Sequence, residues 1–308
     1  MDQQYNTPEN TLPEDILKTV AYFDLFDYPM TVDQIFSYLP RNSVSKTEVA
    51  RISEQLVKER KLLREHDVLF LSSSNVSITV QRKEDEKRAL RMLSYARIIA
   101  MMIKQVPFVR GIFITGSLSK VAAGKGSDID FMIVTSSKRL WIVRSMLTLF
   151  RKIFLFGNKK YLCTNYYVTE NGFSLDRRNL YTAIEVVTTK VLWNPDALME
   201  FRRVNSWTKK LLPNMSESIE TQLVISSARS PLQGTVEFLL NMLPMEFFDR
   251  RLMEFHRSHW NTAFRYVPNH QRETMFIVSP DVSACWPGDR QKLILSLYQE
   301  KLSALGLQ

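Results

Sequence analysis

The 308-residue sequence predicts an α+β protein in three parts. Residues 1–81 combine helical periodicity with two short apolar runs that suit a hairpin. Residues 82–195 place two apolar strands on either side of a Gly-Ser turn, which indicates a mixed sheet flanked by helices. Residues 196–308 show mostly helical periodicity. We therefore expect three domains with these boundaries, the last of them helical.

The first part begins with a helix that has Pro13 in its first turn. A cap at Thr31 predicts a second helix over 32–39, which Pro40 ends. Ser45 and Glu48 have capping-box spacing and predict a third helix that runs to about residue 60. Short strands are expected at 62–63 and 68–71. Three helices and a hairpin in this order resemble a winged helix-turn-helix domain.

Winged helices often place their third helix in the major groove of DNA. The exposed face of this helix would offer Lys46, Thr47 and Arg51 near its start. The excess of basic over acidic residues in 41–65 is small, so the charge also suits a docking or dimerisation module whose surface is simply solvated. Both interpretations, DNA binding and docking, stay open at this point.

The second part begins with a long amphipathic helix, and apolar strands and a core helix follow it. We expect the helix at about 82–105, strands at 111–115 and from residue 128, a helix at 140–156 and a strand at 161–168. Trp141, Phe150, Phe154 and Phe156 are expected to build the core. After residue 168 the hydrophobic pattern predicts helices at 175–192, 196–212, 231–253 and 289–305.

The most informative segment runs from the turn Gly116-Ser117 to the strand start Asp128-Ile129-Asp130-Phe131. Side chains two residues apart in a strand point to the same side, so Asp128 and Asp130 are aimed together. Two adjacent carboxylates beside a buried strand repel unless a cation compensates them. Mg²⁺ takes oxygen ligands of this kind and usually keeps phosphate and water ligands as well. An acidic loop before an ordinary strand is the simpler alternative.

An apolar strand, a Gly-Ser pair and an alternating acid pair about ten residues later resemble the nucleotidyltransferase superfamily, which has the polymerase-beta-like fold. The resemblance implies that Gly116, Ser117, Lys120 and Ser127 hold a nucleoside triphosphate, and that Asp128 and Asp130 are catalytic ligands of Mg²⁺ or Mn²⁺. A nucleoside monophosphate would pass to an unidentified hydroxyl acceptor with release of pyrophosphate. Lys120 and Lys125 are equally compatible with solvated loop lysines. The helices of the last part would form a substrate lid.

Many members of that superfamily carry a third acid on a later strand. Here the polar residue inside the strand is Asn165, which can ligate a metal but cannot take a proton. Glu170 and Asp176 follow and reach the site only if the strand is longer than expected. The alternative function is therefore a non-catalytic regulator, in which a winged helix binds DNA and a degenerate nucleotidyltransferase domain senses a nucleotide.

The composition is that of a soluble globular protein with a formal charge of +9, which favours an anionic partner. The two cysteines, Cys163 and Cys285, have no metal-binding spacing, so we expect a cytoplasmic location. The apolar segment 140–156 contains Arg144 and two further basic residues, so no membrane partner is expected. His256 and His259 share a helix face, and a surface pair is favoured over a metal site.

Overall fold

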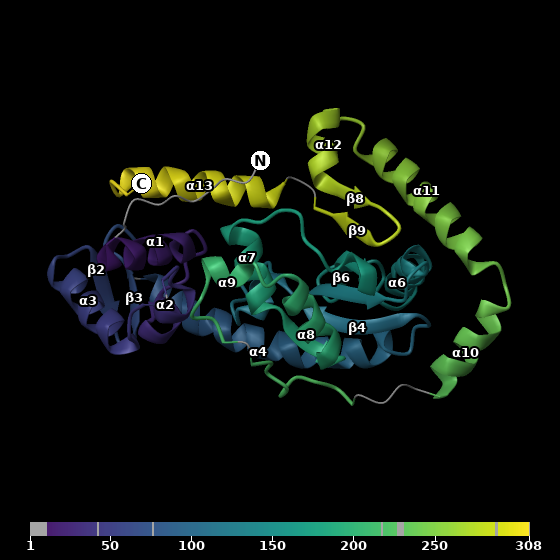
Figure 1. Ribbon diagram of the computed structural model, residues 1–308, viewed down its shortest axis with the longest axis horizontal. Helices are drawn as coiled ribbons and strands as arrows, with labels where there is room; N and C mark the ends of the chain where they lie inside the picture. The colour runs from purple at the N-terminus through teal and green to yellow at the C-terminus, as the bar shows by residue number, and fades with distance from the viewer. Residues whose placement is uncertain are drawn as a thin grey trace.

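The computed structural model describes residues 11–41, 43–75, 77–216, 218–226, 231–286 and 289–307. It has a mixed α+β architecture built around two sheets (Figure 1). The smaller sheet belongs to the N-terminal part of the chain. The larger sheet lies in the middle of the molecule and is covered by helices on both faces.

The N-terminal unit packs three helices on a small antiparallel sheet with the strand order β1-β3-β2. As expected, the Thr31 and Ser45 side chains accept hydrogen bonds from the Gln34 and Glu48 backbone amides and begin the second and third helices. Its elements are α1 (Leu12–Asp24), β1 (Met30–Thr31), α2 (Val32–Tyr38), α3 (Lys46–Lys58), β2 (Leu62–Glu65) and β3 (Val68–Leu71).

The larger sheet has the strand order β7-β4-β5-β6-β9-β8. Strand β5 is antiparallel to β4 and parallel to β6, and the remaining pairs are antiparallel. The helix α6 (Leu140–Phe154) connects the two parallel strands, as a parallel pair requires a crossover. The strands are β4 (Val109–Ile114), β5 (Asp130–Thr135), β6 (Cys163–Thr169), β7 (Lys190–Trp193), β8 (Phe276–Val278) and β9 (Val282–Cys285).

Side chains alternate between the two faces of this sheet and meet different helices. Ile112 and Ile133 face the long helix α4 (Ser77–Ile103), α6 and α11 (Met245–Ala263). Phe113 and Met132 face α7 (Leu180–Thr188) and α8 (Pro195–Val204). This period of two is the pattern of strands that are buried on both sides.

The last third of the chain differs from the expected helical domain. Strands β8 and β9 lie within it and extend the central sheet through the β6–β9 pair. Strand β7 likewise replaces the end of the helix expected over 175–192. The helices are α9 (Thr208–Leu211), α10 (Pro231–Asn241), α11, α12 (Asn269–Met275) and α13 (Arg290–Ala304).

Helix α13 returns to the N-terminal unit and packs along α1 (Figure 1). The Tyr298 ring makes an edge contact with Tyr22 at 5.4 Å, and its hydroxyl donates to the Lys18 carbonyl at 3.1 Å. Ala183 and Ile184 of α7 belong to the same core. The first and last segments of the chain are therefore packed together.

Helix α6 forms as expected, but only part of it is buried. Trp141 is fully buried, whereas the side chains of Phe154 and Phe156 are 64% and 94% exposed. The expectation that all four aromatic residues of this segment build the core is therefore wrong for these two. The sheet covers the first turns of α6 and ends before its last turns do.

Candidate functional site

The Gly-Ser turn lies directly against the start of strand β5. Gly116 and Ser117 begin the short helix α5 (Gly116–Ser119) at the turn after β4. Gly116 has a φ of +70°, a left-handed conformation that glycine adopts without steric cost. A Cβ atom at this position would lie 2.6 Å from Asp130 Oδ2. The Thr115 amide also donates to the Asp130 carbonyl at 3.0 Å. Both the backbone conformation and the close approach of the carboxylate therefore require glycine here.

Two carboxylates, those of Asp128 and Asp130, stand at this turn, and neither forms an ion pair within the described residues. Burial raises the pKa of Asp130 to about 6, and repulsion from Asp128 and Glu185 adds to the effect. Within the described residues, Asp128 makes no hydrogen bond and no ion pair with its side chain. The acid pair predicted from the sequence is thus close enough to interact electrostatically. The strand was expected from residue 128, but β5 begins at Asp130, so Asp128 lies in the loop before it.

Glu185 of α7 is a third acid at the site, and the sequence reasoning missed it. Its carboxylate accepts from the Gly116 amide at 3.1 Å and from Lys120 Nζ at 2.6 Å. Lys120 Nζ also donates to the Gly116 carbonyl at 3.1 Å. Glu185 is the lone charged residue of α7, and an isolated acid in an apolar helix is the signal that was available.

The predicted serines lie next to each other at the mouth of the turn. Ser117 is exposed, and its Oγ lies 3.4 Å from Ser127 Oγ. Lys125 is exposed in the loop between them. Gly116, Ser117, Lys120 and Ser127 are therefore brought together beside the two aspartates, whereas no contact is described between the Lys125 side chain and this group.

The structure places the two candidate positions for a third acid at different distances from the aspartates. Asn165 of β6 points at the pair, with Nδ2 3.5 Å from Asp130 Oδ1. Strand β6 runs parallel to β5 with Cys163 opposite Asp130. Glu170 follows the far end of β6 and is exposed, so the structure does not bring it to the aspartates. Asp176 lies further along the chain and is also exposed.

The charge along the chain singles out the same two residues. Asp128 and Asp130 are the only acids in residues 87–169. The same stretch contains fifteen basic residues: Lys87, Arg88, Arg91, Arg97, Lys104, Arg110, Lys120, Lys125, Lys138, Arg139, Arg144, Arg151, Lys152, Lys159 and Lys160. Two acids that sit side by side in such a basic segment suit a site for a cation and a polyanion together.

The N-terminal unit and the start of α13 both approach the site. The Tyr28 hydroxyl of the N-terminal unit donates to the Lys120 carbonyl at 3.4 Å. At the start of α13, Arg290 interacts electrostatically with Asp130 and lowers its pKa, opposing the effect of burial. The neighbouring Gln291 donates to Thr182 of α7 at 3.3 Å. Arg290 is thus a second residue near the acids that sequence reasoning did not identify.

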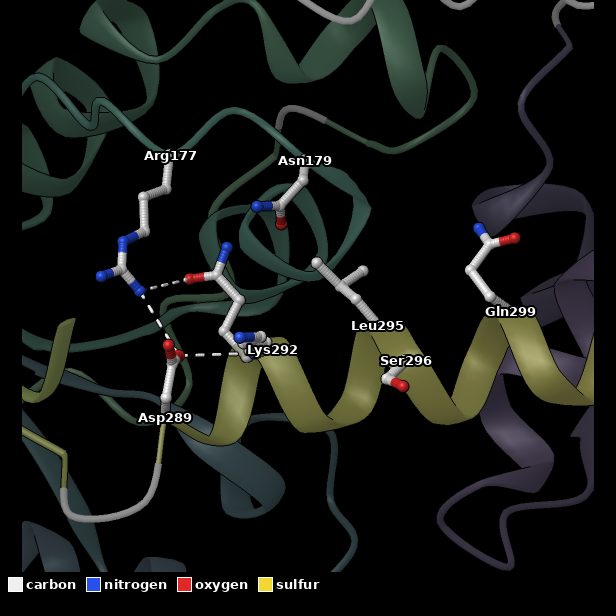
Figure 2. A pocket seen from close by; sticks show the side chains of 8 residues that line it. Arg177, Asn179, Asp289, Lys292, Leu295, Ser296 and Gln299 are labelled. Carbon is white, nitrogen blue, oxygen red and sulfur yellow. Dashed lines mark hydrogen bonds and ion pairs between the residues drawn. The ribbon is translucent and has the colours of Figure 1, made fainter. Parts of the chain in front are cut away.

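A cavity of about 500 Å³ lies beside the start of α13. Figure 2 shows Arg177 directed toward Asp289, with Arg177 Nη1 3.6 Å from Asp289 Oδ1. Arg177 also donates to Gln291 Oε1 at 3.2 Å. The cavity is also lined by Asn179 and Lys292. None of the residues that the sequence analysis proposed for nucleotide or metal binding is among those that line it.

The histidine pair of α11 is not the surface pair expected from the sequence, because one of its two side chains is buried. His256 is buried, and its Nε2 lies 3.1 Å from Ser145 Oγ, while His259 is exposed and stacks on Phe255. Among the described residues there is no group of three or more His, Cys, Asp or Glu side chains that could hold a metal ion. Asp128 and Asp130 would need a substrate or water to complete a coordination shell.

Comparison of the chain with family models, curated proteins and solved structures found no match. None of the helices in the described part of the chain is long and apolar enough to cross a membrane.

Proposed function

We propose that the protein is a Mg²⁺-dependent nucleotidyltransferase whose active site lies at Gly116, Asp128 and Asp130. The observation that carries the proposal is the approach of Asp130 Oδ2 to Gly116, because it places a carboxylate beside an exposed backbone turn. A triphosphate on the turn and a cation on the acids would then share one small volume. We further propose that the central sheet is of the nucleotidyltransferase type and that the N-terminal unit is a winged helix.

The acids fit a divalent cation. Asp128 has no described partner, and burial together with neighbouring acids raises the pKa of Asp130. An added positive charge would relieve that repulsion. When bound, Mg²⁺ neutralises triphosphate oxygens and polarises the phosphorus that is attacked. Asp128 and Asp130 would hold it, and Asn165 lies close enough to add a carbonyl oxygen after its amide turns.

The transfer is a single displacement at phosphorus. The oxygen of an acceptor hydroxyl forms a bond to the α-phosphorus of the nucleotide, and its proton leaves to solvent. The bond between the α-phosphorus and the oxygen that bridges to the β-phosphate breaks, so pyrophosphate leaves with that electron pair. The chain contributes position and charge, because it aligns the groups and excludes alternative orientations.

Lys120 and the Gly116 amide would be the donors for the phosphates. In the free protein the Glu185 carboxylate accepts from both of them. A carboxylate and a phosphate present similar anionic oxygens, so a triphosphate would take the place of Glu185. Ser117 and Ser127 stand at the exposed mouth of the same turn and would contact the outer phosphate.

The test is an assay of pyrophosphate release with each of the four nucleoside triphosphates, Mg²⁺ and a panel of hydroxyl acceptors. Asp130→Asn should lower the rate by about a hundredfold or more, because it removes a ligand charge from the site. The control is Asp196→Asn, which changes an exposed acid at the start of α8. An Asp130→Asn variant as active as this control would refute the assigned role.

A regulator without catalysis is the second candidate. It is favoured by Asn165, which stands beside Asp130 where an acid would serve catalysis, and by the exposed Arg51 on α3. In this function the N-terminal unit binds duplex DNA and the central site only senses a nucleotide. Duplex binding that weakens steeply with salt, together with no Mg²⁺-dependent turnover, would select it.

A further inference from the structure

The end of helix α6 leaves the core and presents large apolar side chains to solvent. Leu149 and Ile153 are both 57% exposed, and Phe154 and Phe156 are exposed still more. We call these four residues the apolar tip. A soluble protein exposes isolated apolar residues commonly, but a cluster of four large ones on consecutive turns indicates an interaction surface.

The tip is held in place by its own backbone. The amides of Leu155 and Gly157 both donate to the Arg151 carbonyl, which closes the end of the helix. Leu155 packs against the core, so the chain turns sharply between two exposed phenylalanines. Phe156 has a φ of 48°, a left-handed conformation that costs a bulky residue about 1–2 kcal/mol.

Three exposed lysines lie next to the tip in the sequence, and we call Lys152, Lys159 and Lys160 the basic collar. In the part of the chain that the structure describes, none of their side chains makes an ion pair. Residues 131–169 contain no acid at all. The charge of the collar is therefore available to an anionic partner.

Aromatic residues continue this surface toward α4. Tyr161 directly follows the collar and makes an edge contact with Tyr95 of α4 at a centroid distance of 6.2 Å. Both tyrosines are exposed. Tyrosine suits a boundary between apolar and aqueous phases, because its ring is apolar and its hydroxyl is polar.

We propose that the apolar tip and the basic collar dock the protein on the surface of a membrane that contains anionic lipids. The tip would enter the boundary between headgroups and acyl chains, while the collar meets lipid phosphates. The two signals are needed together, since each alone gives weak binding. A symmetric contact between two copies of the chain is less favourable, because it would bring the two collars against each other.

This proposal departs from the expectation, drawn from the basic residues of 140–156, that the protein has no membrane partner; the contact is peripheral and is not a membrane span. Helix α6 carries Arg144 and Arg151 and is packed against the sheet along its first turns, so it stays part of the folded domain. In Figure 1 it lies at the end of the central sheet away from α1–α3. The N-terminal unit would therefore face away from the lipid.

The test is flotation of the whole protein with vesicles of phosphatidylcholine alone and of phosphatidylcholine with 30% phosphatidylglycerol, without nucleotide or Mg²⁺. We expect recovery with the anionic vesicles only. Phe154→Ser with Phe156→Ser, and separately Lys159→Glu with Lys160→Glu, should each weaken binding by about tenfold or more. The matched controls are Phe247→Ser with Phe248→Ser and Lys83→Glu with Lys87→Glu, which change exposed residues elsewhere.

Three outcomes would overturn the proposal. The first is absence of the wild-type protein from the anionic vesicle fraction. The second is equal loss of binding in the tip variant and in its control, which would indicate general adhesion. The third is a dimer in light scattering that only the Phe154 and Phe156 substitutions dissociate, which would assign the tip to a second copy. Each can be observed whether or not the protein transfers nucleotides.

Discussion

Gly116 and Asp130 are in such close contact that a methyl group on the glycine would lie 2.6 Å from the aspartate Oδ2. The contact joins the turn after β4 to the first residue of β5. It explains why a glycine and an acid 14 residues apart in the sequence belong to one site. The φ of +70° at Gly116 adds a second, independent requirement for glycine.

Gly116→Ala should therefore displace the Asp130 carboxylate and lower both stability and activity. The left-handed conformation alone costs alanine about 1–2 kcal/mol, and the clash adds to this cost. Gly126→Ala is the matched control, since a Cβ there meets no atom within 4 Å. Chemical denaturation and the pyrophosphate assay measure the two effects. Equal stability and activity in the two variants would contradict the close contact.

Glu185→Gln should strengthen the binding of a triphosphate. Glu185 accepts from Lys120 and from the Gly116 amide, so a phosphate must displace it from both. A neutral amide competes less strongly for these donors, and we expect a gain in affinity of about three- to tenfold. Lys120→Met should act in the opposite direction. Calorimetric titration with Mg²⁺ and tripolyphosphate measures both variants, and weaker binding by Glu185→Gln would contradict the exchange.

His256 should make the protein less stable in mild acid. Burial, Arg144 and His259 lower the pKa of His256 from 6.5 to about 4. Between pH 4 and 6.5 the imidazole of His256 therefore binds a proton more strongly in the unfolded chain than in the folded protein. The contribution of neutral His256 to the free energy of unfolding is fully present above pH 6.5 and is lost as the pH falls toward 4. The loss is up to about 3 kcal/mol. His256→Gln should flatten this part of the urea-denaturation profile against pH, whereas the exposed His259→Gln should leave it unchanged.

Tyr298 should be a major contact between α13 and the N-terminal unit. Its buried ring packs on Tyr22, so Tyr298→Ala should destabilise the protein by about 3 kcal/mol. Tyr298→Phe keeps the ring but removes the hydroxyl that donates to the Lys18 carbonyl, and it should cost about 1 kcal/mol. Tyr266→Ala changes an exposed tyrosine and should have little effect. Thermal unfolding of the three variants would contradict the packing if Tyr298→Ala resembled Tyr266→Ala.

The parts of the site that lie close together in the sequence could be predicted from it. Gly116, Asp128 and Asp130 could be identified from the neighbouring sequence, because they belong to one turn and to the loop and strand that follow it. The helix start at Ser45 could be identified from neighbouring residues in the same way. Glu185 could not be assigned to the site, because the sequence around α7 does not show which side of that helix faces Lys120. Glu170 is far from the aspartates because β6 runs parallel to β5. Asp130 is at the start of β5, whereas Glu170 follows the last residue of β6, at the opposite end of the two strands.

The fold shows the same division between local and long-range information. The helical period of residues 140–154 predicts α6, but it does not show that the neighbouring elements stop short of Phe154 and Phe156. The strands β8 and β9 are short, and β9 pairs with β6 across more than a hundred residues of intervening chain, while β8 pairs with β9. Such pairings are decided by tertiary packing.

The central claim is that Asp128 and Asp130 share one divalent cation with a bound triphosphate. The most direct measurement is a crystal structure of the protein with Mg²⁺ and a non-hydrolysable nucleoside triphosphate. The account predicts an ion about 2.1 Å from an oxygen of each aspartate, with phosphates on the Gly116 turn and Lys120 released from Glu185. A nucleotide bound elsewhere, or aspartate side chains turned apart with no ion between them, would contradict it.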